Sequence, residues 1–353
     1  MKSVTVIVPA YDASNTIGAC IESLLAQTRQ PDELIIVDDC SRDDTAQVAL
    51  KYGVKVIKLE KNSGPGVARN IGAAAAGEIL AFTDSDCVAP ADWLERIVAA
   101  LDAPGVVAAT GGYAGAVQDG FLTRLQHLTI RQRQSALPPE IDSTITSNFA
   151  CLKSAFASVG GFPLYSLKRD PAKPIWGNED EELGFLLARA GGKIRWMPDN
   201  GVLHLFRPSL RGYLRQQRFY AERIIMSHFR FPEMAKSRTN YSRLNGALHL
   251  GSVLGVNLGM FAFLACLVEL WEAICAASSL LWIAVPLYLL LPIQALLGFR
   301  RQGQHGKFIL QSYVVLLAVD IAWLWGAVSG MGLSLGGFIN GHQESSTAPA
   351  AAD

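Results

Sequence analysis

Acidic side chains occur in pairs directly after two short apolar stretches of the chain. One pair is Asp38 and Asp39, and the other is Asp84 and Asp86, which flank Ser85. Two carboxylates one residue apart can bind a hard divalent cation, and the remaining coordination positions of that cation can accept diphosphate oxygens. Acidic pairs also occur in ordinary turns, so the position of Asp84 and Asp86 in the fold decides between the two interpretations.

A second acidic cluster and a single histidine could complete such a site. Glu179, Asp180, Glu181 and Glu182 open a segment whose apolar residues recur at helical spacing. Acids in a first helical turn stabilise the helix dipole, but one such carboxylate can also take the proton of an alcohol nucleophile. His204 ends a short apolar stretch, where it is either a hydrogen-bonded core residue or a metal ligand.

The elements that would position these side chains alternate regularly along the first hundred residues. Short β-branched stretches alternate with segments whose apolar residues are spaced as in a helix. We predict strands at 4–8, 33–37, 54–59 and 78–82, and helices at 15–27, 43–52, 66–76 and after Pro90. This pattern predicts an α/β fold with a mostly parallel sheet flanked by helices. Ligands of such sheets bind at the carboxyl ends of the strands, where both acidic pairs lie.

Several classes of function are disfavoured by the sequence. The chain has 31 basic and 31 acidic residues, and this neutrality argues against a nucleic-acid partner. The first predicted strand is followed by Pro9-Ala10-Tyr11-Asp12, without the glycines of a dinucleotide-binding loop, and the chain has no P-loop motif. Its six cysteines form no C-x-x-C pair, which favours reduced, packed thiols over a disulfide framework.

Four motifs in this alternating region resemble glycosyltransferase family 2. They are Val6-Ile7-Val8-Pro9-Ala10-Tyr11, Ile36-Val37-Asp38-Asp39-Cys40-Ser41, Gly66-Val67-Ala68-Arg69-Asn70-Ile71-Gly72 and Phe82-Thr83-Asp84-Ser85-Asp86. The likeness continues through Glu179-Asp180 to His204 and covers roughly residues 3–220. The resemblance implies the Rossmann-like GT-A fold, an inverting transfer from a UDP- or GDP-linked nucleotide sugar, and a divalent metal, Mg²⁺ or Mn²⁺.

The resemblance also implies roles for individual residues. Asp180 would be the catalytic base, and Asp86 and His204 would be metal ligands. The donor would contact Pro9, Tyr11, Asp39, Arg69 and Asp84. Where the family has Gly-Glu-Asp, this chain has Asn178 between Gly177 and Glu179, so Glu179 and Glu181 remain alternative bases.

Some of these roles have structural alternatives. Asp39 would contact the nucleobase, or it would hold a local turn with Ser41. Arg69 would contact the nucleotide, or it would form an ion pair with a neighbouring acid. Tyr11 would line the base and ribose pocket, or it would pack in the core.

The C-terminal third has the composition of a membrane-embedded segment. Three runs of low charge predict transmembrane helices at 244–268, 274–299 and 308–331, each long enough to cross a bilayer. The basic residues Arg243, Arg300, Arg301 and Lys307 lie on one side of these spans, so the positive-inside rule predicts a multi-pass inner-membrane protein. The domain at 1–235 would then be cytoplasmic and the C-terminus outside. Residues 205–243, rich in arginine and aromatics, would lie on anionic headgroups, and 334–353 would be disordered.

Together these observations predict a membrane-anchored inverting glycosyltransferase of the hexosyltransferase type. The acceptor would be a lipid-linked molecule or a saccharide at the cytoplasmic membrane face, in cell-envelope or exopolysaccharide synthesis. One alternative is a polyprenyl-phosphate glycosyltransferase, whose phosphate acceptor needs no strong base. A processive synthase is disfavoured by the altered motif Arg215-Gln216-Gln217-Arg218-Phe219, and a non-catalytic nucleotide-sugar sensor by the set of predicted site residues.

Overall fold

The protein is described by a computed structural model that covers residues 2–75, 77–167, 170–175, 177–236, 292–335 and 339–342. The chain divides into two compact units. The first comprises 1–206 together with 334–353, and the second comprises 207–333. The predicted span at 244–268 and most of the one at 274–299 lie outside the described residues.

The first unit is built on a parallel sheet, as the alternation predicts. Four strands lie in the order β3-β2-β1-β4 and all pair in parallel. Their bounds are Val4–Ala10 for β1, Glu33–Asp38 for β2, Lys55–Lys58 for β3 and Ile79–Phe82 for β4. The connecting helices are α1 (Ile17–Leu25), α2 (Thr45–Leu50) and α3 (Pro65–Ala74), and α4 (Trp93–Ala99) follows β4. These boundaries agree with the predicted elements to within two or three residues.

The other half of the sheet mixes strand directions. β8 (Phe149–Leu152) lies antiparallel between β4 and β6 (Val106–Ala116). β11 (Lys193–His204) runs parallel to β6 and antiparallel to the short strands β5 (Cys87–Val88) and β7 (Glu140–Ile141). β6 contains three glycines and four alanines, which have low β propensity, so only its pairing with two neighbours makes it a strand.

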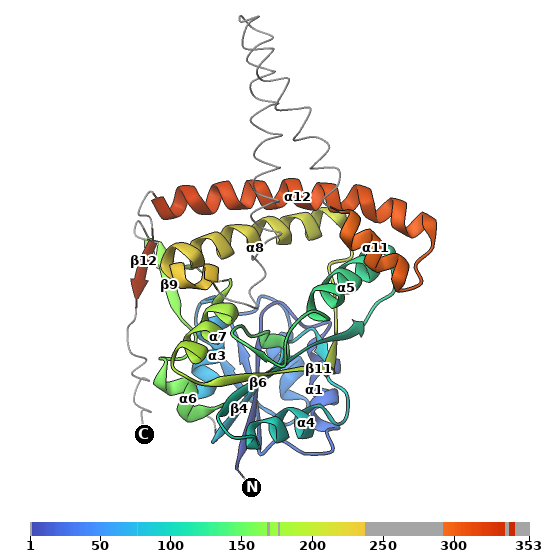
Figure 1. Cartoon of the computed structure of the whole chain (residues 1–353). Helices are drawn as coiled ribbons and strands as arrows, with labels where there is room; N and C mark the ends of the chain where they lie inside the picture. Colours follow the sequence, from blue (N-terminus) through green and yellow to red (C-terminus); the bar gives the residue numbers. More distant parts are fainter. Residues whose placement is uncertain are drawn as a thin grey trace, which may run out of the picture. The chain divides into compact units, whose positions relative to one another are not determined.

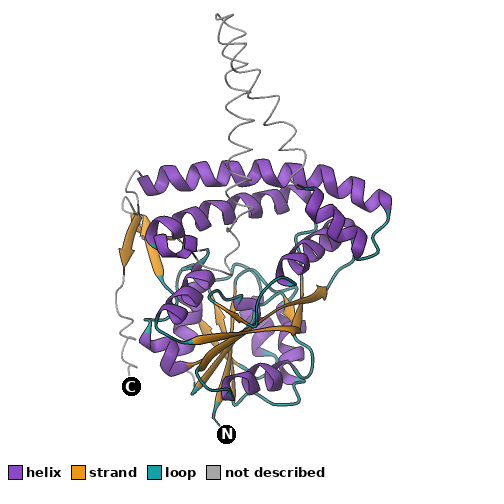
Figure 2. Ribbon diagram, in the orientation of Figure 1, coloured by secondary structure: helices purple, strands orange, loops and turns teal. Residues whose placement is uncertain are grey.

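Helices cover both faces of this sheet, and each face has its own apolar core (Figure 1, Figure 2). Alternate side chains of β1 point to opposite faces, so Val4, Val6 and Val8 pack with α1 and α4, whereas Ile7 packs with α3. The second core also includes α6 (Lys153–Ser158) and α7 (Glu179–Arg189). The remaining described elements of this sheet region are α5 (Phe121–Gln134) and the 3₁₀ turns η1 (Ala100–Asp102) and η2 (Thr146–Asn148).

A separate small sheet brings the C-terminal segment back to the first unit. β9 (Leu164–Leu167) pairs antiparallel with β10 (Asp170–Ile175) and with β12 (Ile339–His342). The sequence predicts disorder throughout 334–353, and this prediction is wrong for 339–342. The cause is tertiary, because the hydrogen-bond partner of β12 lies about 170 residues earlier in the chain.

The second unit is helical. It contains α8 (Leu210–Arg230), η3 (Pro232–Lys236), α11 (Ile293–Arg301) and most of α12 (Gly306–Leu335). α8 and α12 run side by side (Figure 1), and Cβ atoms built on Gly326 and Gly330 would meet the backbone of α8. Among the described residues, Gly306–Ser334 is a helical segment long and apolar enough to cross a membrane.

Candidate active site

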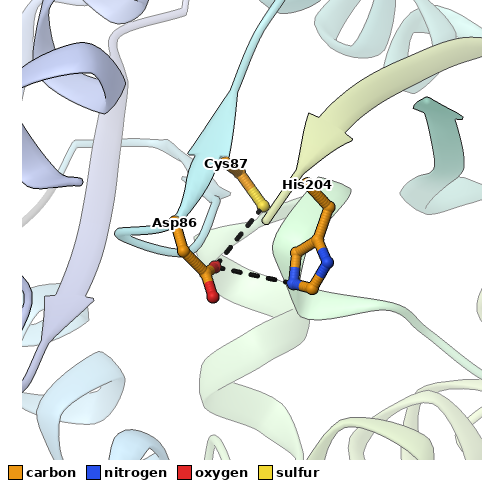
Figure 3. Close-up of side chains that lie close together, drawn as sticks. All are labelled: Asp86, Cys87 and His204. Carbon is orange, nitrogen blue, oxygen red and sulfur yellow. Dashed lines mark hydrogen bonds and ion pairs between the residues drawn. The ribbon is translucent and has the colours of Figure 1, made fainter. Parts of the chain in front are cut away.

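The pairing of β5 with β11 creates an acidic corner at one edge of the sheet. The antiparallel register sets His204 opposite Cys87, and the Leu205 N–H donates to the Asp86 carbonyl over 3.0 Å. As a result, His204 Nε2 lies 3.6 Å from Asp86 Oδ1 (Figure 3). Two residues that are 118 positions apart in the sequence therefore point toward one another, as the resemblance implies.

The donor set of this corner fits a divalent cation. A carboxylate oxygen and an imidazole nitrogen, each about 2.1 Å from one ion, lie roughly 3–4 Å apart, which matches the separation of Asp86 and His204. His204 Nδ1 is buried, and the ring packs against Tyr113 and Phe206, with centroids 4.8 and 4.7 Å away. These aromatic rings fix the imidazole so that Nε2 faces the carboxylate.

Cys87, which was not predicted as a site residue, lies beside the same corner. Its Sγ atom is 3.9 Å from Asp86 Oδ1, and its ligand atom lies within 4.8 Å of those of Asp86 and His204. However, the side chain is buried, and burial raises the pKa of the Cys87 thiol well above its ordinary value. A protonated thiol is a poor ligand for a hard cation, so Asp86 and His204 are the better ligand pair.

Arg69 connects the acidic loop after β4 with the start of α7. One guanidinium nitrogen donates to Asp84 Oδ1 over 2.7 Å, and the other donates to Glu179 Oε1 over 3.0 Å. The Arg69 side chain is only 5% exposed and packs on the ring of Phe162. The sequence allowed either a nucleotide contact or an ion pair for Arg69. In the structure Arg69 is buried and forms ion pairs with two acids, Asp84 and Glu179. Glu179 was not predicted as its partner, because nothing local links positions 110 residues apart.

The first turn of α7 holds the predicted base in a partly buried position. Asn178 has a positive φ of 69°, a conformation that Asn adopts more readily than most residues, and α7 then begins at Glu179. The extra residue before Glu179 is thus absorbed by the turn. Burial raises the pKa of Asp180 to about 7, the neighbouring Glu179 adds to this rise, and Arg69 opposes it. A carboxylate with this pKa suits a general base near neutral pH.

The alternative bases are less suited to proton transfer. Glu179 is bound by Arg69, and its second oxygen accepts the Gly177 N–H over 2.7 Å. Glu181 is buried, and burial together with Asp180 and Glu182 raises the pKa of Glu181 to about 8. Glu181 is therefore protonated near neutral pH. Asp180 remains the best-placed base, as a prediction.

The predicted donor side lies at the ends of β1 and β2. Tyr11 is 41% exposed and carries the Arg42 guanidinium 5.5 Å from its ring centroid, while Pro9 is buried within β1. Arg42 also pairs with Asp12, which ties the two strand ends together. Neither Arg42 nor Asp12 was predicted, because their contact joins two different loops.

Asp39 has a visible structural role. Its two carboxylate oxygens accept the backbone N–H groups of Ser63 and Gly64, each over 2.7 Å, directly before α3. Burial raises the pKa of Asp39, although these two hydrogen bonds act in the opposite direction. Asp38 forms the local turn instead, by accepting the Ser41 N–H over 3.2 Å. A nucleobase contact by Asp39 stays a prediction.

Two asparagine side chains, Asn148 and Asn70, form hydrogen bonds that connect separate segments of the first unit. Asn148 is fully buried and accepts from Trp93 Nε1 over 2.8 Å while donating to the Gly112 carbonyl over 3.0 Å. Asn70, next to Arg69, exchanges two hydrogen bonds with the backbone of Phe162. These contacts show that both asparagines contribute to the packing of the fold.

Comparison with known proteins shows which family model part of the chain matches. Residues 5–160 match the model of glycosyl transferase family 2. The chain is 36% identical over 166 residues to the succinoglycan biosynthesis protein ExoO of Rhizobium meliloti. The aligned region covers 44% of this chain and 48% of that protein. The chain is 27% identical over 232 residues to the pre-mycofactocin glycosyltransferase of Mycobacterium tuberculosis, covering 62% of this chain and 46% of that protein. The chain thus spans about half the length of these curated relatives.

A solved structure has the same fold. The mannosyltransferase PcManGT from Pyrobaculum calidifontis, in complex with GDP-Man and Mn²⁺, superposes with a TM-score of 0.58. The match covers 94% of this chain and 87% of that one, at 20% sequence identity. Residues 5–160 of the present chain thus match the model of glycosyl transferase family 2, and the chain has an α/β sheet of the GT-A type.

Proposed function

We propose that this protein is a membrane-attached, metal-dependent inverting glycosyltransferase of the hexosyltransferase type. It transfers a sugar from a UDP- or GDP-linked donor to a lipid-linked or saccharide acceptor at the cytoplasmic membrane face. The process served is cell-envelope or exopolysaccharide synthesis. The family 2 domain supports the reaction class, and the likeness to a succinoglycan biosynthesis protein supports the process.

The observation that carries this proposal is the two-sided contact of Arg69. By binding Asp84 and Glu179, Arg69 places the D-x-D loop next to the first turn of α7. This contact supports the proposal that Asp86 and His204 at one end, and Asp180 at the other, belong to one site. Such a site can neutralise the diphosphate of the donor and deprotonate the acceptor hydroxyl that attacks the donor sugar.

The chemistry follows from these positions. The acceptor hydroxyl oxygen attacks the anomeric carbon from the side opposite the diphosphate, and the bond from that carbon to the diphosphate oxygen breaks. Asp180 takes the hydroxyl proton. Because the attack comes from the side opposite the leaving diphosphate, the anomeric configuration inverts in one step. A divalent cation held by Asp86 and His204 would supply charge neutralisation for the departing diphosphate.

The proposal is tested with the purified full-length chain and a panel of nucleotide sugars. Donor binding should require Mn²⁺ or Mg²⁺ and should be lost with EDTA. Asp86→Ala should abolish metal-dependent binding, whereas the matched control Cys87→Ala should retain it. Unchanged donor affinity and turnover in EDTA, or for Asp86→Ala, would disprove the metal-dependent site.

A second variant identifies the acceptor class. Asp180→Asn should lower turnover by about 10²–10⁴-fold if the acceptor is an alcohol, because the general base is lost. Donor affinity should remain, since Asp180 has no predicted role in donor binding. Retained turnover would instead favour a polyprenyl-phosphate acceptor, which arrives already ionised. Absence of turnover with every donor would support a non-catalytic sensor.

A further inference from the structure

One face of α12 is apolar and exposed along most of its length. Within the described residues, its large exposed apolar side chains are Leu310, Val314, Ile321, Trp325 and Val328. At 100° per residue they fall within about 60° of one another, and at 1.5 Å per residue they extend over roughly 27 Å. We call these five residues the outer stripe.

The opposite face of α12 packs closely on α8. Trp323 Nε1 donates to Gln217 Oε1 over 2.9 Å, and Ser329 Oγ donates to Glu222 Oε2 over 2.6 Å. Gly326 and Gly330 complete this face, since added Cβ atoms would lie 2.0 and 2.5 Å from backbone oxygens of α8. Within the described part of the chain, α12 thus packs on α8 along one side, and the apolar side chains of its outer stripe need a separate partner.

The composition of α8 argues against both helices crossing a bilayer. α8 exposes Arg211, Arg215 and Arg218, and each arginine in the centre of a spanning helix costs about 2.5–3.5 kcal/mol. Because α12 lies along α8, the pair fits a depth at which arginines reach headgroups and apolar side chains reach acyl chains. Asp320, about 100° around α12 from the outer stripe, would then lie at headgroup level.

The segment after α12 gives an independent reason. β12 pairs with β9 of the glycosyltransferase unit through residues 339–342. Backbone pairing cannot form across a membrane, so the C-terminal end of α12 must lie on the same side as that unit. A spanning α12 would put these residues on the far side if the two predicted upstream spans form a hairpin.

We propose that α12 lies along the membrane surface, with its outer stripe among the acyl chains of the leaflet that faces the glycosyltransferase unit. This inference rests on the membrane attachment in the proposed function. It replaces the predicted span at 308–331 and the predicted outside C-terminus with a surface helix and a C-terminus on the side of the catalytic domain.

The first test is the sidedness of the C-terminus. Full-length protein carrying epitope tags at both ends is expressed in a bacterial host, and right-side-out and inside-out membrane vesicles are treated with protease. Both tags should be removed only from inside-out vesicles, with the N-terminal tag as the internal reference. Removal of the C-terminal tag from right-side-out vesicles would overturn the proposal. Failure of the protein to sediment with membranes would instead contradict the proposed attachment itself.

The second test measures depth with nitroxide labels on the full-length protein in lipid vesicles. The background replaces Cys40, Cys266 and Cys275 by Ala, since the other three cysteines are Cys20, Cys87 and Cys151, which are buried. Labels go on the variants Val314→Cys, Ile321→Cys and Val328→Cys, with exposed Gln311→Cys as the control off the stripe.

The expected depths distinguish the possible occupants of the stripe. The three stripe labels should report the same depth, all accessible to oxygen, whereas the label at 311 should be accessible to a polar nickel reagent. A spanning helix would spread the labels at 314 and 328 over about 21 Å of depth, and this result would overturn the proposal. Labels that are immobile and inaccessible to both reagents would also overturn it, in favour of a second copy of the chain.

Discussion

The proposed chemistry depends on how burial tunes single carboxylates. Asp180 and Glu181 are adjacent in one helical turn, and we propose a different role for each. Asp180 is partly exposed, with a pKa raised to about 7, so it can exchange a proton near neutrality. Glu181 is buried, with a pKa raised to about 8, so it is mainly a neutral packing group. Burial is the main cause of both shifts, and the two side chains differ in exposure, since Asp180 is partly exposed and Glu181 is buried.

The pH dependence of turnover should report Asp180. Because only the ionised carboxylate can take the acceptor proton, kcat should fall about tenfold per pH unit below an inflection near 7. The rate is measured at saturating donor and metal between pH 5 and 9. Donor affinity over the same range is the control, because an equal loss of affinity would assign the inflection to the metal corner instead.

Glu181 should make stability depend on pH in a definite direction. Its folded pKa is raised to about 8, so the folded state binds more protons than the unfolded state at intermediate pH. This stabilising contribution is present at acidic pH and is lost as pH rises toward 8. The Tm of Glu181→Gln minus the Tm of the wild type should therefore increase as pH rises from 5 to 8. The exposed Glu60→Gln is the control, and an equal gain in both variants would contradict the assignment.

At the scale of elements, α3 positions the site through both of its faces. Asp39 anchors the loop before α3, Arg69 extends from the helix to the acidic loop and α7, and Gly72 packs on β1. α3 thereby connects the sheet, through Gly72, with the first turn of α7, through Arg69, where the proposed base Asp180 lies. Changes on either face should have separate effects, on catalysis for Arg69 and on stability for Gly72.

Substitution of Arg69 should separate charge from geometry. Arg69→Gln removes the positive charge that lowers the pKa of Asp180, so the inflection in kcat should move to higher pH. Arg69→Lys keeps the charge but cannot bind two carboxylates in the same fork, so the inflection should stay while kcat falls by up to about 10²-fold. Arg96→Gln, in an exposed ion pair, is the control. Identical pH profiles for both Arg69 variants would exclude this positioning role.

Gly72 should be required for the packing of α3 on the sheet. A Cβ atom at this position would lie 2.5 Å from Ile7 Cγ2 and 3.2 Å from Val37 Cγ2. Gly72→Ala should therefore lower the free energy of unfolding by about 1–3 kcal/mol, through overpacking of the core. Gly18→Ala is the matched control, because its Cβ would meet only the end of the Tyr52 side chain. Thermal unfolding of both variants makes the comparison, and equal stability would contradict the packing argument.

At the scale of the whole molecule, the region that matches family 2 and the apolar runs are separated along the chain. The family 2 domain occupies 5–160, whereas the long runs of low charge begin at 244. Between them, α8 carries arginines that can contact anionic headgroups but cannot anchor the chain through acyl chains. Salt should therefore release a chain that is attached only by its arginines, but not a chain that is inserted through apolar side chains.

Membrane attachment should withstand salt and alkaline washing. We expect the full-length chain to remain in the pellet after high-salt and carbonate extraction, because insertion of apolar runs is not screened by ions. The variant Arg211→Gln/Arg215→Gln/Arg218→Gln should behave in the same way. Release of the wild-type chain by salt alone would show that attachment is electrostatic and would argue against the predicted spans at 244–268 and 274–299.

The sequence by itself predicted the α/β alternation, the family and the separate apolar region, because these depend on local periodicity and on short motifs. It also indicated that Asp84, Asp86 and Asp180 carry chemistry, although their roles remain predictions. Tertiary structure decided the partners: His204 opposite Asp86, and Glu179 as the second acid of Arg69. It likewise returned 339–342 to β9. Each of these contacts joins residues far apart in the chain, and burial in the folded sheet, rather than local sequence, brings them together.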